Sequence, residues 1–227
     1  MLFIVGTEKG GAGKSTIAQN LAYRLVKGSS GKSLSVQLVD TDTTSTSAQW
    51  IDRRDHFNVE PKIELMRALK NPESAIVRSN DNFDAVVVDT GARSYENFRE
   101  FARIADLWIA PVQVGMGDLD SALAMHEALR RLDKSHKSGR VPICFVLNRT
   151  STNTNSTEEE DAREYLLGVD PEFPLIGQSI KERKVWRDAQ KVGRSIFEMP
   201  SQIAQKATQE FTKVLGEAMK YKSKVGA

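Results

Sequence analysis

The chain has 227 residues, of which 40% are hydrophobic and 27% charged, and its formal net charge is +2. This length predicts one large domain over residues 1–227, with two small domains as the alternative, and the composition excludes collagen-like, disulfide-scaffold and wholly disordered proteins. The single cysteine, Cys144, excludes an internal disulfide and a cluster held by cysteines alone. No apolar run approaches the ~20 residues of a membrane span, so we expect a protein of the reducing cytoplasm.

Short apolar runs alternate with helical periodicity along the first two thirds of the chain. The apolar runs are Leu2–Gly6, Leu34–Val39, Phe83–Val88, Leu107–Val112 and Ile143–Leu147. Helical patterns cover Ser15 to about Lys27, Tyr95–Ala105 and Asp118–Asp133. Strands that are separated by helices form parallel sheets with both faces covered, joined by right-handed crossovers. The sequence therefore predicts an α/β fold with a mostly parallel central sheet flanked by helices on both faces.

The last third of the chain is polar at first and then basic. Thr150–Thr157 predicts an exposed loop, and Thr157 with Glu160 fits a capping box that opens a helix through about Leu167. Two closing helices are expected over Lys181–Val192 and Gln202–Lys220, with a frayed end. From residue 177 to 227 there are eleven Lys/Arg and five Asp/Glu. This excess indicates an anionic partner such as nucleic acid, with a solvated helical surface as the alternative.

The most specific motif is KGGAGKST, residues 9–16, which stands directly between a predicted strand and a predicted helix. Glycines let backbone N–H groups surround phosphate oxygens, so Gly10, Gly11, Ala12, Gly13 and Thr16 are expected to line a nucleotide phosphate site. In such a loop Lys14 reaches the β- and γ-phosphates and the Ser15 hydroxyl binds Mg²⁺. The alternative is a glycine turn that only joins strand to helix.

The loop departs from the standard pattern, because Glu8 stands where the first glycine is expected and Lys9 is an extra lysine. In this it resembles the deviant Walker A ATPases, which include ParA and MinD, over Leu2 to about Met199. The resemblance implies a P-loop NTPase fold, ATP/ADP and Mg²⁺ as cofactors, and a nucleotide-sandwich homodimer. Lys9 would then act catalytically on phosphates held by the other subunit, and the alternative is a solvent-exposed lysine near its own nucleotide.

Acidic residues follow two of the predicted strands, and ligands bind at that edge of a parallel sheet. Asp40 and Asp42 stand in LVDTDTT, and Asp89 ends FDAVVVD. By resemblance, Asp42 positions the hydrolytic water, Asp40 lies near the metal, and Asp89 is the Walker B carboxylate that holds Mg²⁺. Turn and N-cap chemistry is the alternative for the first two. Thr43–Thr44 replaces the family's Pro-Gln pair, which bears on the hydrolysis rate.

Asn148 follows the strand FVLN, and by resemblance its amide contacts the adenine base. A plain turn at the end of the strand is the alternative reading. No Ser/His/Asp or Cys/His set stands out, and the three histidines are scattered along the sequence. The expected chemistry is therefore ATP hydrolysis itself, used as a timer. The resemblance implies a weak intrinsic rate that a partner stimulates.

The stretch from Gly177 to Met199 resembles the ParA segment that contributes to nonspecific DNA binding. Its basic residues are Lys181, Arg183, Lys184, Arg187, Lys191 and Arg194. Lys184, Arg187 and Lys191 are spaced to lie along one helix face, where they could contact several phosphates. Trp186 could stack on a base, but a core position is the preferred interpretation.

Together these features predict a small ParA-type ATPase that dimerises with ATP, binds DNA nonspecifically and is released by a ParB-like or other adaptor. Its output would be plasmid or chromosome partition, or cargo positioning, on the nucleoid of a bacterial or archaeal cell. No N-terminal DNA-binding domain is expected, because the loop begins at residue 9. No membrane partner is expected either, because VLGEAMKYKSKVGA lacks a bulky apolar face. The alternatives are an ATP-dependent scaffold in conjugative DNA transfer and a metabolic ATP-using ligase or kinase of the dethiobiotin synthetase type.

Overall fold

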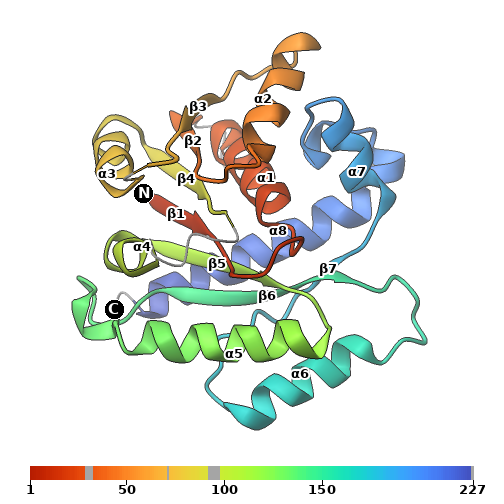
Figure 1. The fold of residues 1–227 in the computed structure, drawn as a ribbon. Coiled ribbons are helices and arrows are strands. Elements are labelled where there is room, and N and C mark those ends of the chain that lie inside the picture. Colours follow the sequence, from red (N-terminus) through yellow and green to blue (C-terminus); the bar gives the residue numbers. More distant parts are fainter. Residues whose placement is uncertain (29–32, 71, 92–97, 226–227) are drawn as a thin grey trace.

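The computed structural model describes residues 1–28, 33–70, 72–91 and 98–225. In these residues seven strands form one sheet in the order β3-β2-β4-β1-β5-β6-β7 (Figure 1). The strands are β1 (Leu2–Val5), β2 (Val36–Asp40), β3 (Glu64–Arg67), β4 (Ala85–Asp89), β5 (Leu107–Val112), β6 (Ile143–Thr150) and β7 (Ile180–Lys181). Every pairing is parallel, which confirms the predicted α/β class.

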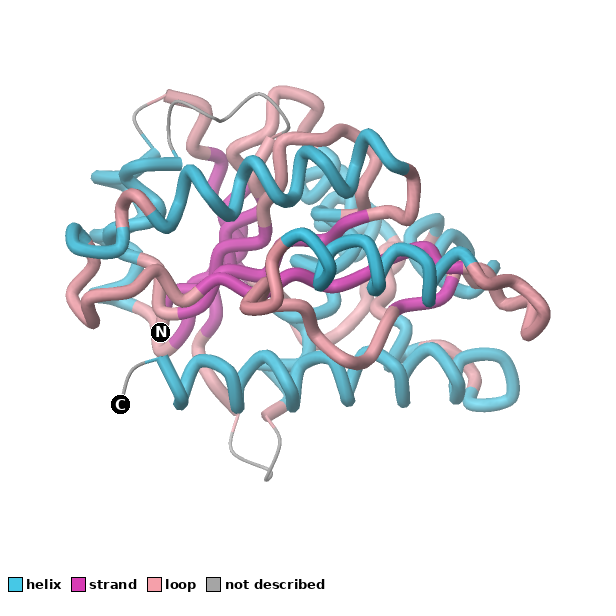
Figure 2. Tube along the Cα trace, turned by 90° about the horizontal axis from the view of Figure 1, so that it is seen from below, coloured by secondary structure: helices cyan, strands magenta, loops and turns pink. Residues whose placement is uncertain are grey.

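Helices cover both faces of the sheet. They are α1 (Lys14–Lys27), α2 (Thr46–His56), α3 (Pro72–Asn82), α4 (Phe98–Ile104), α5 (Met116–Arg130), α6 (Glu158–Val169), α7 (Lys184–Lys191) and α8 (Ser201–Val225), with 3₁₀ turns η2 (Asp133–Ser135) and η3 (Ile196–Glu198). One core cluster joins the sheet to α1, α2, α7 and α8, and the other joins it to α3, α4, α5 and α6. Figure 2 shows the strands between these two helical layers.

The alternation of side chains along β1 explains the two cores. Phe3 and Val5 belong to the first cluster, and Leu2 and Ile4 belong to the second. A strand that is buried on both sides reads as a continuous apolar run, which is why β1, β4 and β5 were recognisable in the sequence. Within the described residues, no helix is long and apolar enough to cross a bilayer.

Several element boundaries differ from the sequence prediction. Lys181 lies in β7, so the closing helix α7 begins only at Lys184. The Thr157 hydroxyl bonds the Asp161 carboxylate at 2.9 Å, and the predicted capping box with Glu160 does not form. The elements α2, β3, α3 and β7 were missed. The predicted helix over Tyr95–Ala105 begins outside the described residues, and its described part is α4.

The expectation of a frayed C-terminus was wrong, because α8 continues through Val225. Its apolar stripe, which includes Phe211 and Val214, is fully buried in the first core cluster. Tyr221 packs against the same cluster and so extends the contact to the last turns. A helix gains most of its stability from such packing, which outweighs the weak local pattern of the final residues.

A buried arginine joins α2 to the segment between α7 and α8. Arg54 is 1% exposed and pairs with the Glu198 carboxylate at 2.6 Å. Its guanidinium also donates to the backbone carbonyls of Gly193 and Pro61, each at 2.9 Å. Gly193 has a φ of +65°, and a Cβ there would lie 2.3 Å from the Arg54 backbone nitrogen. This close approach holds α2 and α7 side by side and so fixes the position of α7.

We expect Arg54→Ala to lower the free energy of unfolding by about 3–5 kcal/mol, because it leaves Glu198 buried without its partner. Urea unfolding measures the change. The control is Arg53→Ala at the neighbouring residue, whose guanidinium makes only an exposed contact of 3.5 Å with the Gln49 side chain. This variant should change the free energy of unfolding by less than about 0.5 kcal/mol. Equal losses in the two variants would contradict this account.

Candidate functional site

The residues predicted for the phosphate and metal site lie at the carboxyl edge of the central strands. β1 leads into the KGGAGKST loop, β2 ends at Asp40, and β4 ends at Asp89 directly beside it in register. β1 and β5 are neighbours in the sheet, and they connect to their next strands across opposite faces, β1 through α1 and β5 through α5. Ligands bind in the crevice at such a switch point in open α/β sheets.

The loop turns into α1 through left-handed glycines. Gly11 has a φ of +78° and Gly13 a φ of +95°, conformations that residues with a Cβ rarely adopt. A Cβ at Gly13 would also lie 2.2 Å from the Asn148 side-chain nitrogen. Gly13 is therefore required both by its backbone conformation and by its neighbour. The loop ends at the N-terminus of α1, whose free N–H groups favour an anion.

Lys14 is buried at the start of α1. Its Nζ donates to the backbone carbonyl of Lys9 at 2.7 Å, so the side chain folds back along the loop. Burial lowers the pKa of Lys14, while the nearby carboxylates of Asp89 and Asp42 raise it. The structure thus brings the predicted lysine and two predicted carboxylates together around the loop.

Lys9, in contrast to Lys14, is not buried. Its side chain is exposed, and its Nζ lies 3.8 Å from the position that a Cβ on Gly117 would occupy at the start of α5. Two lysines of one loop therefore have different surroundings. Lys14 is enclosed by its own loop, whereas the Lys9 side chain is accessible from outside the molecule.

Asp89 is fully buried and only partly bonded. Its Oδ2 accepts the Ser47 hydroxyl at 2.7 Å, whereas Oδ1 has no hydrogen-bond partner among the described residues. Burial raises the pKa of Asp89 to about 7, against the opposing effects of the Ser47 and Ser15 hydroxyls. A buried carboxylate oxygen without a partner, close to a serine hydroxyl, fits the oxygen ligands that Mg²⁺ prefers.

Asp40 and Asp42 shape the loop that follows β2. Both carboxylate oxygens of Asp40 accept backbone N–H groups at 2.9 Å, one from Asp42 and one from Ala48. Burial raises the pKa of Asp40, and these hydrogen bonds lower it. Asp42 is partly exposed, and its Oδ1 accepts the N–H of Thr44 at 2.9 Å. The contacts of Asp40 are those of the turn alternative, whereas Asp42 retains an accessible carboxylate near Lys14.

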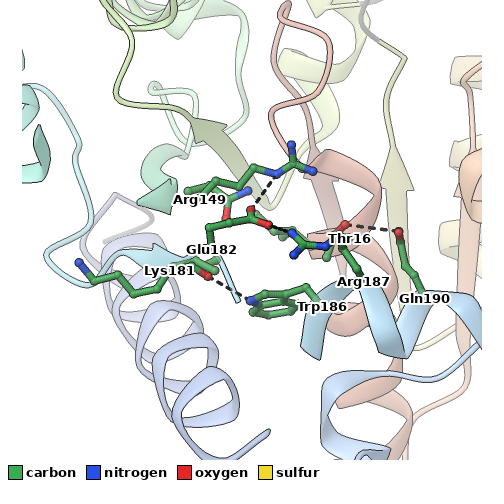
Figure 3. Close-up of a pocket in the computed structure, with 11 residues that line it drawn as sticks. Thr16, Arg149, Lys181, Glu182, Trp186, Arg187 and Gln190 are labelled. Atoms are coloured by element: carbon green, nitrogen blue, oxygen red, sulfur yellow. Dashed lines mark hydrogen bonds and ion pairs between the residues drawn. The ribbon is translucent and has the colours of Figure 1, made fainter. Parts of the chain in front are cut away.

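Asn148 contacts the loop directly. Its side-chain nitrogen donates to the Ala12 carbonyl at 2.7 Å, so the end of β6 braces the phosphate loop. Beside it lies a cavity of about 40 Å³, which Gly13, Thr16 and Asn148 line together with residues of β7 and α7 (Figure 3). Sequence reasoning missed three further lining residues, Arg149, Glu182 and Gln190. The positive φ of Arg149 (+58°) leaves no signature in the sequence.

The six basic residues proposed for DNA do not share one surface role. Lys181 pairs with Glu159 at 2.6 Å, and Arg183 pairs with Glu210 at 2.5 Å, so both hold β7 in place. Burial would raise the pKa of Glu159, but hydrogen bonds from Lys181, Ser179 and Arg163 lower it to about 2. The exposed members are Lys184, Arg187, Lys191 and Arg194. The first three lie on α7, and Trp186 is buried as preferred.

The titration of Asp89 yields a stability prediction. Near pH 4 the Asp89 carboxyl is largely protonated in the folded chain. As pH rises through about 7, the unfolded chain gives up this proton more readily than the folded chain, so the free energy of unfolding falls. Without nucleotide and with a chelator, Asp89→Asn should therefore match the wild type near pH 4 and exceed its unfolding free energy by up to about 4 kcal/mol near pH 8. Urea unfolding at several pH values measures this, and parallel pH profiles of the two proteins would refute it.

Comparison with known proteins agrees with this geometry. A family model described as the CobQ/CobB/MinD/ParA nucleotide binding domain matches residues 3–196. No curated protein matches the sequence.

The fold is similar to the ATP complex of a McdA variant from Cyanothece, with a TM-score of 0.68, 16% identity and coverage of 95% of this chain and 96% of that one. It is also similar to a plasmid partition protein from Borrelia burgdorferi (TM-score 0.63, 16% identity, coverage of 96% and 97%). A third similar structure is the MinC:MinD cell division complex of Aquifex aeolicus (TM-score 0.69, 16% identity, coverage of 96% and 95%). The chain therefore belongs to the CobQ/CobB/MinD/ParA family of nucleotide-binding domains, which confirms its resemblance to ParA and MinD.

Proposed function

We propose that this chain is a small ParA-type ATPase that dimerises with ATP, binds DNA without sequence preference, and uses hydrolysis to end that state. The observation that carries the proposal is that the two lysines of one loop have different surroundings. Lys14 is buried beside Asp89 and Asp42, and Lys9 is exposed. A single-subunit phosphate site needs only the first lysine.

Within one subunit, the backbone N–H groups of residues 10–13 and the N-terminus of α1 bind the phosphates, and Lys14 neutralises the terminal ones. Ser15 and Asp89 would hold Mg²⁺, and Asp40 keeps the neighbouring turn in place. When bound, the cation offsets the charge that develops on the phosphate oxygens. Asp42 orients the attacking water. The cavity beside Asn148 would take the adenosine once part of its lining moves aside.

Between subunits, Lys9 contacts the phosphates of the partner's nucleotide. Two nucleotides that face each other carry a large negative charge, and a lysine from each side compensates it through charge-assisted hydrogen bonds. Dimerisation then requires the nucleotide. Hydrolysis weakens the contact, and a ParB-like or other adaptor would accelerate it.

The exposed cations of α7 form the DNA surface. Two α7 surfaces per dimer neutralise more phosphates than one, so DNA affinity follows the nucleotide state. Partition of a plasmid or chromosome, or positioning of another cargo on the nucleoid, is the output that such a cycle supports. McdA, plasmid partition proteins and MinD share the fold and so provide the analogy.

Lysine variants separate nucleotide binding from dimerisation. We expect Lys14→Ala to lose measurable binding of a slowly hydrolysed ATP analogue in calorimetry, because it removes the cation of the phosphate site. Lys9→Ala should bind the analogue within about threefold of wild type yet remain monomeric by light scattering, since only its contact with the partner is lost. A Lys9→Ala dimer would disprove the role in trans. Wild-type dimers that form but never hydrolyse ATP would favour the scaffold alternative.

Charge reversal on α7 tests the DNA surface. Lys184→Glu and Lys191→Glu should each weaken binding of random-sequence duplex DNA about tenfold and reduce the salt dependence of log K by roughly one to two units. Their side chains are 82% and 74% exposed, so neither change should unfold the protein. Lys134→Glu, an exposed cation in η2, is the control and should bind as the wild type does. Uniform weakening by all three variants would argue against a specific α7 surface.

A further inference from the structure

A bridge of three charged side chains lines the cavity beside the phosphate loop. Glu182, between β7 and α7, pairs with the Arg187 guanidinium and lies 3.5 Å from the Arg149 guanidinium (Figure 3). All three residues line the cavity together with Thr16 and Trp186. One carboxylate thus joins the end of β6 to the first turns of α7.

The accessible space in this cavity is too small for a nucleoside. Its volume is about 40 Å³, whereas ligand pockets measure roughly 300 Å³ or more. A base can enter only when part of the lining withdraws. Trp186 is buried and its indole donates to the Lys181 carbonyl at 3.2 Å, so it is fixed. The half-exposed charged bridge is the part of the lining that can move.

Helix α7 touches both the nucleotide site and the basic surface. The Gln190 amide donates to the Thr16 hydroxyl at 3.4 Å and to the Gln19 side chain at 3.3 Å, so α7 lies against the first turns of α1. Arg187 lines the cavity and also lies between the exposed Lys184 and Lys191. While Glu182 holds Arg187, one positive charge of the basic surface is neutralised.

We propose that Glu182 is an internal counter-ion that closes the nucleoside cavity through Arg187, and that an incoming adenosine group displaces it and frees Arg187 for DNA phosphate. This rests on the proposed function of the site and adds a coupling inside a single subunit, independent of dimerisation. Nucleotide and DNA both favour the open bridge, so each tightens the other by the same factor. Because partly exposed ion pairs are weak, the coupling is about two- to fivefold.

Two substitutions with opposite charge effects test the coupling. Glu182→Gln and Arg187→Gln are compared with wild type by calorimetric titration of ADP–Mg²⁺ and by binding of a short random-sequence DNA duplex over a salt series. Light scattering checks that the protein remains monomeric in each titration, and only these conditions are compared. Glu127→Gln is the matched control, because Glu127 forms an exposed pair with Arg131 on α5, away from the cavity.

Glu182→Gln should bind ADP two- to fivefold more tightly than wild type. Without nucleotide, it should also bind DNA more tightly, with a salt slope steeper by about one. Arg187→Gln should bind ADP more tightly although it has lost a positive charge, and should bind DNA more weakly. ADP should steepen the salt slope of wild type but not of either variant. Glu127→Gln should behave as wild type.

Weaker ADP binding by Arg187→Gln, or a Glu182→Gln protein that matches Glu127→Gln, would overturn the counter-ion role. The ADP titrations test the counter-ion role even if the wild type binds no DNA. Absence of DNA binding by the wild type would refute the DNA part of the proposed function. A wild type that binds no ADP would contradict both.

Discussion

Two opposite charges buried at the carboxyl edge of the central strands are the constraint on which the rest of the site depends. Lys14 and Asp89 lie close enough to influence each other, yet burial lowers the pKa of the first and raises that of the second to about 7. Each group is driven toward neutrality, and one Asp89 oxygen has no hydrogen-bond partner among the described residues. A polyanion with a divalent cation would supply the charges that favour both ionised forms. The parallel register that sets Asp40 beside Asp89 keeps this arrangement in place.

The connection from this edge to the surface passes through α7. The helix begins just after β7, lies against α1 through Gln190, and is held from α2 by the buried Arg54–Glu198 pair. Its position is therefore fixed by buried contacts, while its charged side chains remain at the surface. In our proposal, an adenosine group that displaces Glu182 would alter which of those charges are neutralised without displacing the helix. The basic surface would then respond to the nucleotide through local ion pairing as well as through the proposed dimerisation.

The sequence was sufficient for the fold class and for the position of the KGGAGKST loop between β1 and α1, because both depend on local patterns. Apolar runs mark strands buried on two faces, and the spacing of Gly13, Lys14 and Ser15 carries the chemistry of the loop. Partners distant in the chain left no such pattern. Nothing near Lys181 indicates its pairing with Glu159, and nothing near Asn148 indicates its bond to the Ala12 carbonyl. The full length of α8 likewise depends on a long-range apolar contact that the polar C-terminal residues conceal.

The most direct test of the account is a titration of the wild-type chain with a slowly hydrolysed ATP analogue, with and without Mg²⁺, while calorimetry records binding and light scattering records mass. We expect one nucleotide to bind per chain, Mg²⁺ to tighten binding by at least tenfold, and the mass to double as the site fills. A chain that binds the analogue equally well without Mg²⁺, or that stays monomeric at saturation, would contradict it.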